Sequence, residues 1–107
     1  MDGNRRWAKR NNLPSVMGHP KGAETLTEIV KAALDLRIKI LTVFAFSTEN
    51  WGRSNEEITD VMNLFSIYLK KQLKFMIERK ISLNVIGDLK KCPLFLQNDF
   101  NDTIEKT

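Results

Sequence analysis

The sequence predicts an α/β fold in which a parallel sheet is flanked by helices. Helices are expected over 20–36, 55–79 and 93–105, because apolar residues recur there at helical spacing. Two short apolar runs, 38–46 and 81–86, alternate with the helices and have the composition of buried strands. Helices and strands that alternate in this way form parallel sheets with right-handed crossovers.

The helix over 20–36 has a favourable start and a less favourable end. Pro20 suits a first helical turn, because its φ is already helical and it lacks an N–H that would be unpaired there. Arg37 occupies the turn after the helix, where glycine would cost least. His19 stands at the helix start, either as a donor to a bound anion or as a helix cap without a ligand.

The longer helix opens with a capping box, in which Ser54 is the N-cap and Glu57 reaches back to it. Its apolar stripe contains Ile58, Val61, Met62, Phe65, Tyr68, Leu69, Leu73, Met76 and Ile77. Such a stripe is more often core than binding surface, and the alternative is that part of it lines an apolar ligand channel.

Length, charge and cysteine count limit the class of protein. A chain of 107 residues suits one small domain, and 17 Lys+Arg against 13 Asp+Glu give a net charge of +4. This excess favours an anionic partner such as a phosphate ester, nucleic acid or acidic membrane. Cys92 is the single cysteine, which excludes an intrachain disulfide and a CxxC metal site. No apolar stretch has the length of a transmembrane helix.

Two polar clusters carry the candidate chemistry. The first, Met1–Trp7, combines a carboxylate, a glycine, an amide, two guanidiniums and an indole without an apolar period, so it is either a frayed terminus or an anion site. The second, Ser47–Arg53, follows a predicted strand, at the sheet edge where open α/β folds bind ligands.

Several motifs are absent from the sequence, and their absence weighs against some kinds of chemistry at this sheet edge. The sequence has no Walker A motif and no G-x-S-x-G motif, which weighs against a P-loop and a serine nucleophile. It has no two-histidine metal motif either. Mg²⁺ held by a single carboxylate together with substrate phosphates is therefore the expected metal.

Four motifs occur along the chain. They are Met1-Asp2-Gly3-Asn4-Arg5-Arg6-Trp7-Ala8-Lys9, then Gly18-His19 with Gly22, then Ala45-Phe46-Ser47-Thr48-Glu49-Asn50-Trp51-x-Arg53, then Val85-Ile86-Gly87-Asp88. Together they resemble the cis-prenyltransferase family, and within it the undecaprenyl diphosphate synthases or isoprenyl transferases. The motifs occur in the family's order and spacing across 1–107, which makes the resemblance specific.

The resemblance implies an enzyme that adds isopentenyl diphosphate repeatedly to an allylic diphosphate, such as farnesyl diphosphate, and makes cis-polyprenyl diphosphates with Mg²⁺. The implied catalytic residues are Asp2, which would hold the metal, and Asn50, which would accept a proton. Residues 3–6 would form a loop around the allylic diphosphate, and the product would lie in an apolar tunnel beside helices 20–36 and 55–79. The implied substrate-binding residues are Gly3, Asn4, Arg5, Arg6, Trp7, Ser15, His19, Ser47, Thr48, Glu49, Trp51 and Arg53.

The resemblance also implies what this chain lacks. The family usually has an arginine where Ser15 stands. Its first strand, before Met1, and its C-terminal half, with the R-x-S-x-F-L segment that binds isopentenyl diphosphate, fall outside the sequence. Residues 1–107 are therefore expected to be a partial domain, the allylic-substrate half, and inactive alone. A full-length member is expected to be a homodimer in the cytoplasm or at the membrane surface, or in a plastid or other organelle. Its membrane-associated product would serve as a cell-wall lipid carrier.

Two other functions stay open on the residues. A non-catalytic subunit of the same fold is one, although such a subunit would be expected to lose Asp2, Asn4, Arg6, Asn50 and Arg53. A phosphate-binding α/β module for nucleotides or nucleic acid is the other. The absence of a Walker motif and of aromatic residues on a basic face weighs against it, so no nucleic-acid partner is expected.

Overall fold

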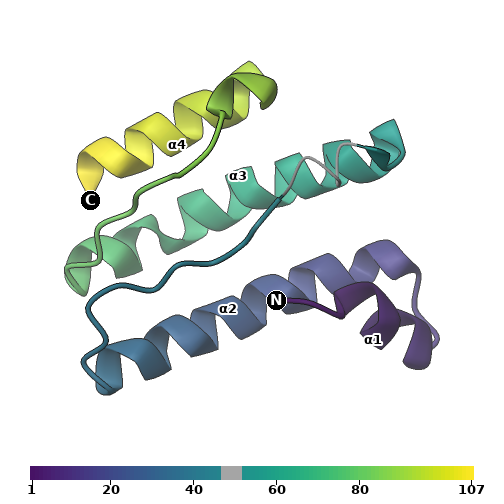
Figure 1. The fold of residues 1–107 in the computed structure, drawn as a ribbon, viewed down its shortest axis with the longest axis horizontal. Helices are drawn as coiled ribbons and strands as arrows, with labels where there is room; N and C mark the ends of the chain where they lie inside the picture. The colour runs from purple at the N-terminus through teal and green to yellow at the C-terminus, as the bar shows by residue number, and fades with distance from the viewer. Residues whose placement is uncertain (47–51) are drawn as a thin grey trace. The chain divides into compact units, whose positions relative to one another are not determined.

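A computed structural model describes residues 1–46 and 52–107. They form two compact units, Met1–Ile58 and Thr59–Thr107. The first unit contains α1 (Asn4–Arg10), the short 3₁₀ helix η1 (Ser15–Met17), α2 (Gly18–Asp35) and the first turn of α3 (Asn55–Glu78) (Figure 1). The second unit contains the rest of α3, the 3₁₀ helix η3 (Leu89–Lys91) and α4 (Leu94–Lys106).

The three long helices that the apolar spacing predicts are confirmed, with bounds that differ by at most two residues. α2 begins at Gly18 instead of Pro20, and Pro93 is the N-cap of α4 instead of its first residue. The implied loop over residues 3–6 is wrong beyond Gly3, because Asn4–Arg10 is helical. This short helix has no apolar stripe to reveal it. Its one buried residue is Ala8, which is 0% exposed.

The predicted parallel sheet is not seen, since no residue of 1–46 or 52–107 lies in a strand. The runs 38–46 and 81–86 are drawn in Figure 1 as irregular segments that follow α2 and α3. Ile40, Phe44 and Ile86 are 82%, 85% and 88% exposed. A strand requires ladder hydrogen bonds from a neighbouring strand, and an apolar run by itself does not supply them.

Both α2 and α3 end in a left-handed residue that is not glycine. Arg37 has a φ of 57°, and the two bonds of a Schellman motif surround it, from Arg37 N to Leu34 O at 3.0 Å and from Ile38 N to Ala33 O at 2.9 Å. Lys80, with a φ of 56°, ends α3 in the same way. A side chain in this conformation costs about 1–2 kcal/mol.

Replacing Arg37 with glycine is expected to raise the free energy of unfolding by about 1 kcal/mol, because glycine adopts the left-handed conformation without a Cβ penalty. The midpoint of urea denaturation measures this change. Lys39→Gly is the matched control, since Lys39 is exposed and does not have a positive φ. An Arg37→Gly chain that is less stable than the natural chain would contradict the expectation.

The second unit has its own core. Its buried apolar residues, each at most 8% exposed, are Val61, Met62, Leu69, Met76 and Leu96. The core interpretation of the α3 stripe is confirmed at these α3 positions, whereas Ile77 is 48% exposed. The buried Ser66 hydroxyl donates to the carboxylate of Asp99, and so joins α3 to α4. In the ranges 1–46 and 52–107, the helices lack the combined length and apolar character that a membrane span needs.

Candidate functional site

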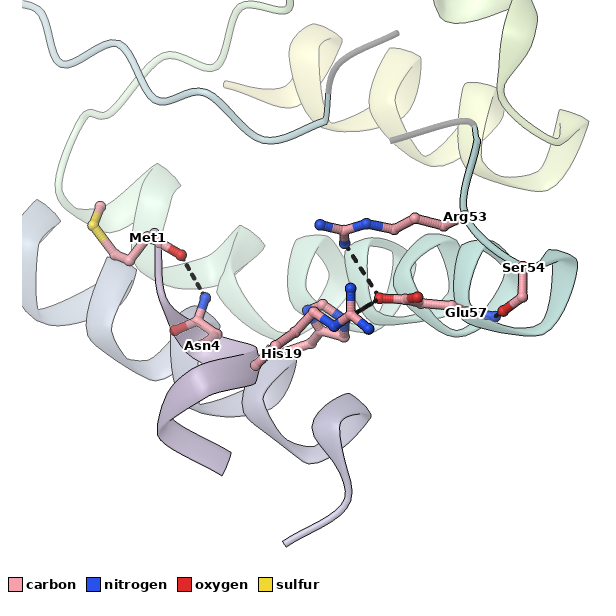
Figure 2. Close-up of polar contacts among 7 residues, drawn as sticks. Met1, Asn4, His19, Arg53, Ser54 and Glu57 are labelled. Atoms are coloured by element: carbon pink, nitrogen blue, oxygen red, sulfur yellow. Dashed lines mark hydrogen bonds and ion pairs between the residues drawn. The ribbon is translucent and has the colours of Figure 1, made fainter. Parts of the chain in front are cut away.

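The start of the chain is folded around Gly3. Gly3 has a φ of 84°, in the left-handed region that favours glycine. Its N–H donates to Asp2 Oδ1 at 2.7 Å. The Asn4 side-chain amide donates to the Met1 carbonyl oxygen at 2.5 Å (Figure 2). Local hydrogen bonds therefore hold the first four residues, which favours the anion-site interpretation over a frayed terminus.

Two buried glycines of α2 allow α1 to approach closely. A Cβ added to Gly18 would lie 2.5 Å from the carbonyl carbon of Asn4, and one added to Gly22 would lie 2.9 Å from Asn4 Cγ. Both distances are shorter than van der Waals contact. The first turn of α1, which carries the candidate phosphate ligands, is therefore positioned by direct packing on α2.

A small hollow on α1 is lined by Gly3, Arg6, Trp7 and Arg10. Its volume of about 250 Å³ is below the ~300–1,000 Å³ of most small-molecule pockets. Lys21 Nζ lies 5.9 Å from the centre of the Trp7 ring, which brings another cation to the same helix. The size and the two guanidiniums suit a small anion better than an apolar chain.

The carboxylate of Glu57 lies close to two arginine side chains and one histidine side chain of the first unit (Figure 2). Its Oε1 lies 3.6 Å from Arg5 Nε, 3.5 Å from His19 Nε2 and 3.3 Å from Arg53 Nη1. These groups come from α1, α2 and the segment that precedes α3. The Glu57 side chain is only 12% exposed, so water screens the cluster less than it would a surface ion pair.

Two predictions about helix starts change in this cluster. His19 is not a cap, because α2 has Met17 at its N-cap position and no side-chain capping bond. His19 Nε2 is instead buried beside Glu57, with no hydrogen-bond partner in the described part of the chain. Half of the capping box is confirmed, since Glu57 N donates to Ser54 Oγ at 3.3 Å. The Glu57 carboxylate lies against the cations.

The remaining predicted site residues are placed unevenly. Ser15 is the first residue of η1 and belongs neither to the lining of the hollow nor to the Glu57 contacts. Arg53 is described and contacts Glu57. The predictions for Ser47, Thr48, Glu49, Asn50 and Trp51 lie outside the described residues.

The metal prediction depends on Asp2. Among residues 1–46 and 52–107, no three or more His, Cys, Asp or Glu side chains are grouped as a metal cage. The Asp2 carboxylate is fully exposed and lies 3.8 Å from Arg6 Nη2, at the edge of the hollow. A lone exposed carboxylate fits Mg²⁺ that takes its other ligands from water and substrate phosphates.

Cys92 does not offer a nucleophile. Burial raises the pKa of the Cys92 thiol, and the nearby Asp88 carboxylate raises this pKa further. The thiolate, which is the reactive form, is therefore disfavoured.

Comparison with known proteins identifies the family. The family profile described as "Putative undecaprenyl diphosphate synthase" matches residues 1–107. The chain belongs to this family. It is 45% identical to an isoprenyl transferase from Chlamydia pneumoniae, with all of this chain and 44% of that protein aligned. It is 43% identical to an isoprenyl transferase from Treponema denticola, with all of this chain and 47% of that protein aligned.

A solved structure has the same fold. Lavandulyl diphosphate synthase from Lavandula x intermedia, in complex with dimethylallyl diphosphate, matches with a TM-score of 0.93 and 29% identity over 99% of this chain and 46% of that chain. The chain thus spans about half the length of the prenyltransferases it matches.

Sequence reasoning missed Glu57 as a member of the site and assigned it only to helix capping. A signal was present, because Arg53 and Glu57 are four residues apart and so can face each other. Arg10 was missed too, although it follows Arg6 by four residues on the same helix. Nothing in the spacing links Glu57 to Arg5 or His19, whose contacts depend on the tertiary fold.

Proposed function

We propose that the protein is an isoprenyl transferase that condenses isopentenyl diphosphate with an allylic diphosphate to make a cis-polyprenyl diphosphate. This chain would supply the site for the allylic diphosphate. The observation that carries the proposal is the TM-score of 0.93 with a synthase that holds dimethylallyl diphosphate. The cationic hollow and the Glu57 cluster support it, because both suit a polyanionic head group.

In this proposal Arg6 and Arg10, at the hollow, bind diphosphate oxygens through their guanidinium forks. These donors stabilise the negative charge that grows on the diphosphate as its bond to the allylic carbon breaks. Asp2 would hold Mg²⁺, which when bound neutralises charge on the leaving diphosphate. Asn50 would accept the proton lost in forming the new double bond. A homodimer, a cytoplasmic location and a membrane-associated product remain part of the proposal for a full-length protein.

Calorimetric titration of the 107-residue chain tests the binding step. Dimethylallyl diphosphate is expected to bind more tightly than ATP at equal ionic strength, and no prenyl transfer is expected from this chain alone. Arg6→Gln is expected to weaken dimethylallyl diphosphate binding about 10- to 100-fold, because a charge-assisted hydrogen bond is lost.

Arg79→Gln is the matched control, since it removes the same charge from the second unit, and about a twofold change at most is expected from it. ATP binding that equals or exceeds dimethylallyl diphosphate binding would favour the nucleotide module and contradict the proposal.

A further inference from the structure

The contacts that Glu57 makes with Arg5, His19 and Arg53 all end on a single carboxylate oxygen, Oε1. Arg5 reaches this oxygen through Nε, and Arg53 reaches it through Nη1. A guanidinium carries five N–H donors, so these contacts leave both terminal nitrogens of Arg5, and Nε and Nη2 of Arg53, for another anion. The arrangement therefore orients two arginines without exhausting their capacity to bind phosphate.

We propose that Glu57 is a positioning residue, which holds Arg5, His19 and Arg53 together before a diphosphate binds. This inference rests on the proposed function, because Glu57 can position Arg5, His19 and Arg53 for a diphosphate only if the protein binds one. Without an anion between them, two guanidiniums repel each other, and their long side chains sample many rotamers. Glu57 counters both effects. The entropy cost of ordering these side chains is therefore incurred when the chain folds, and not when the ligand binds.

The surroundings of Glu57 suit this role. Its carboxylate is 12% exposed and its backbone N–H is bonded to Ser54 Oγ, so the residue is anchored at the start of α3. The three partners belong to α1, α2 and the segment before α3, so only the tertiary fold brings all three together. His19 Nε2 has no hydrogen-bond partner in the described residues, and Glu57 Oε1 lies 3.5 Å away. Removing Glu57 would leave this buried nitrogen without the carboxylate beside it.

The Glu57→Asp variant distinguishes the positioning of the arginines from the effect of the negative charge alone. The variant keeps the negative charge at the helix start, but its carboxylate stops about 1.5 Å short, the length of one C–C bond. The control is Glu56→Asp, which makes the same change at an exposed residue of the same turn. The probe is inorganic pyrophosphate, titrated calorimetrically into the 107-residue chain, with far-ultraviolet circular dichroism to compare folding.

Glu57→Asp is expected to weaken pyrophosphate binding about tenfold, comparable to the low end of what the loss of an outer-shell partner costs at metal sites. Glu56→Asp is expected to change the affinity by about twofold or less. Equal affinities of the two variants would overturn the proposal while leaving the proposed function in place.

A spectroscopic readout applies even if a variant is less stable. In ¹H–¹⁵N spectra of the unliganded chain, the Arg5 Nε–H signal is expected to shift in Glu57→Asp and to stay in place in Glu56→Asp. An unchanged Arg5 signal would overturn the proposal. If the natural chain does not bind pyrophosphate at all, the proposed function fails, and this signal still decides whether Glu57 holds Arg5.

Discussion

Replacing Gly18 with alanine is expected to destabilise the first unit by about 3 kcal/mol, at the upper end of what overpacking usually costs. The added Cβ would lie 2.5 Å from the carbonyl carbon of Asn4 and 3.2 Å from the backbone N of Arg5. These are backbone atoms in the first turn of α1, so a change of rotamer does not relieve the clash. Because a domain of this size is stable by only about 5–15 kcal/mol, urea denaturation should resolve the loss readily.

Two other glycines provide the controls. Gly52→Ala is expected to leave stability nearly unchanged, because a Cβ there would have no atom within 4 Å among the described residues beyond its chain neighbours. Gly22→Ala would clash with the side chain of Asn4, so Asn4→Ala should restore much of the stability lost by Gly22→Ala. The same Asn4→Ala change should not rescue Gly18→Ala. Rescue of both glycine variants would show that the Asn4 side chain, and not the α1 backbone, sets the packing.

This packing explains which parts of the fold the sequence could predict. α2, α3 and α4 were predictable because each has an apolar face with helical spacing, and local propensity agrees with that face. α1 was not, because its Asn-Arg-Arg-Trp start has no such face and depends on contact with Gly18 and Gly22. The two glycines were visible in the sequence as parts of a motif, but their physical reason is a tertiary contact.

The apolar runs 38–46 and 81–86 illustrate a different limit. Their composition predicts strands, yet whether a strand forms depends on a neighbouring strand that the pattern of one segment cannot supply.

The candidate site was likewise predictable only in part. The residue types of the opening heptapeptide left an anion site and a frayed terminus open, and in the structure Gly3, Arg6 and Trp7 line one hollow. Glu57 was hidden because Arg5 and His19, which it contacts, lie far away in the sequence.

Replacing Asp2 with asparagine is expected to abolish the effect of Mg²⁺ on pyrophosphate binding. In the natural chain, Mg²⁺ should raise the affinity about tenfold or more, because Asp2 would hold the ion, whose charge would offset that of the pyrophosphate. In Asp2→Asn the amide is a far weaker ligand, so affinities with and without Mg²⁺ should converge. Asp35→Asn, which neutralises an exposed carboxylate at the end of α2, should keep the Mg²⁺ effect.

The direction in which Asp2→Asn changes pyrophosphate affinity without metal distinguishes a metal-binding role of Asp2 from a structural one. Asp2 lies 3.8 Å from Arg6 Nη2, and Arg6 lines the hollow, so the Asp2 charge opposes an incoming anion when no metal is present. In metal-free buffer, Asp2→Asn should therefore bind pyrophosphate as well as the natural chain, or up to about fivefold more tightly. A structural role predicts the reverse, because asparagine can still accept from Gly3 N but lacks the charge that strengthens this bond, and a weaker bond would lower the affinity with and without Mg²⁺ alike. Weaker binding in metal-free buffer, together with a retained Mg²⁺ effect, would thus overturn the metal role of Asp2 and assign the residue to holding the Gly3 turn.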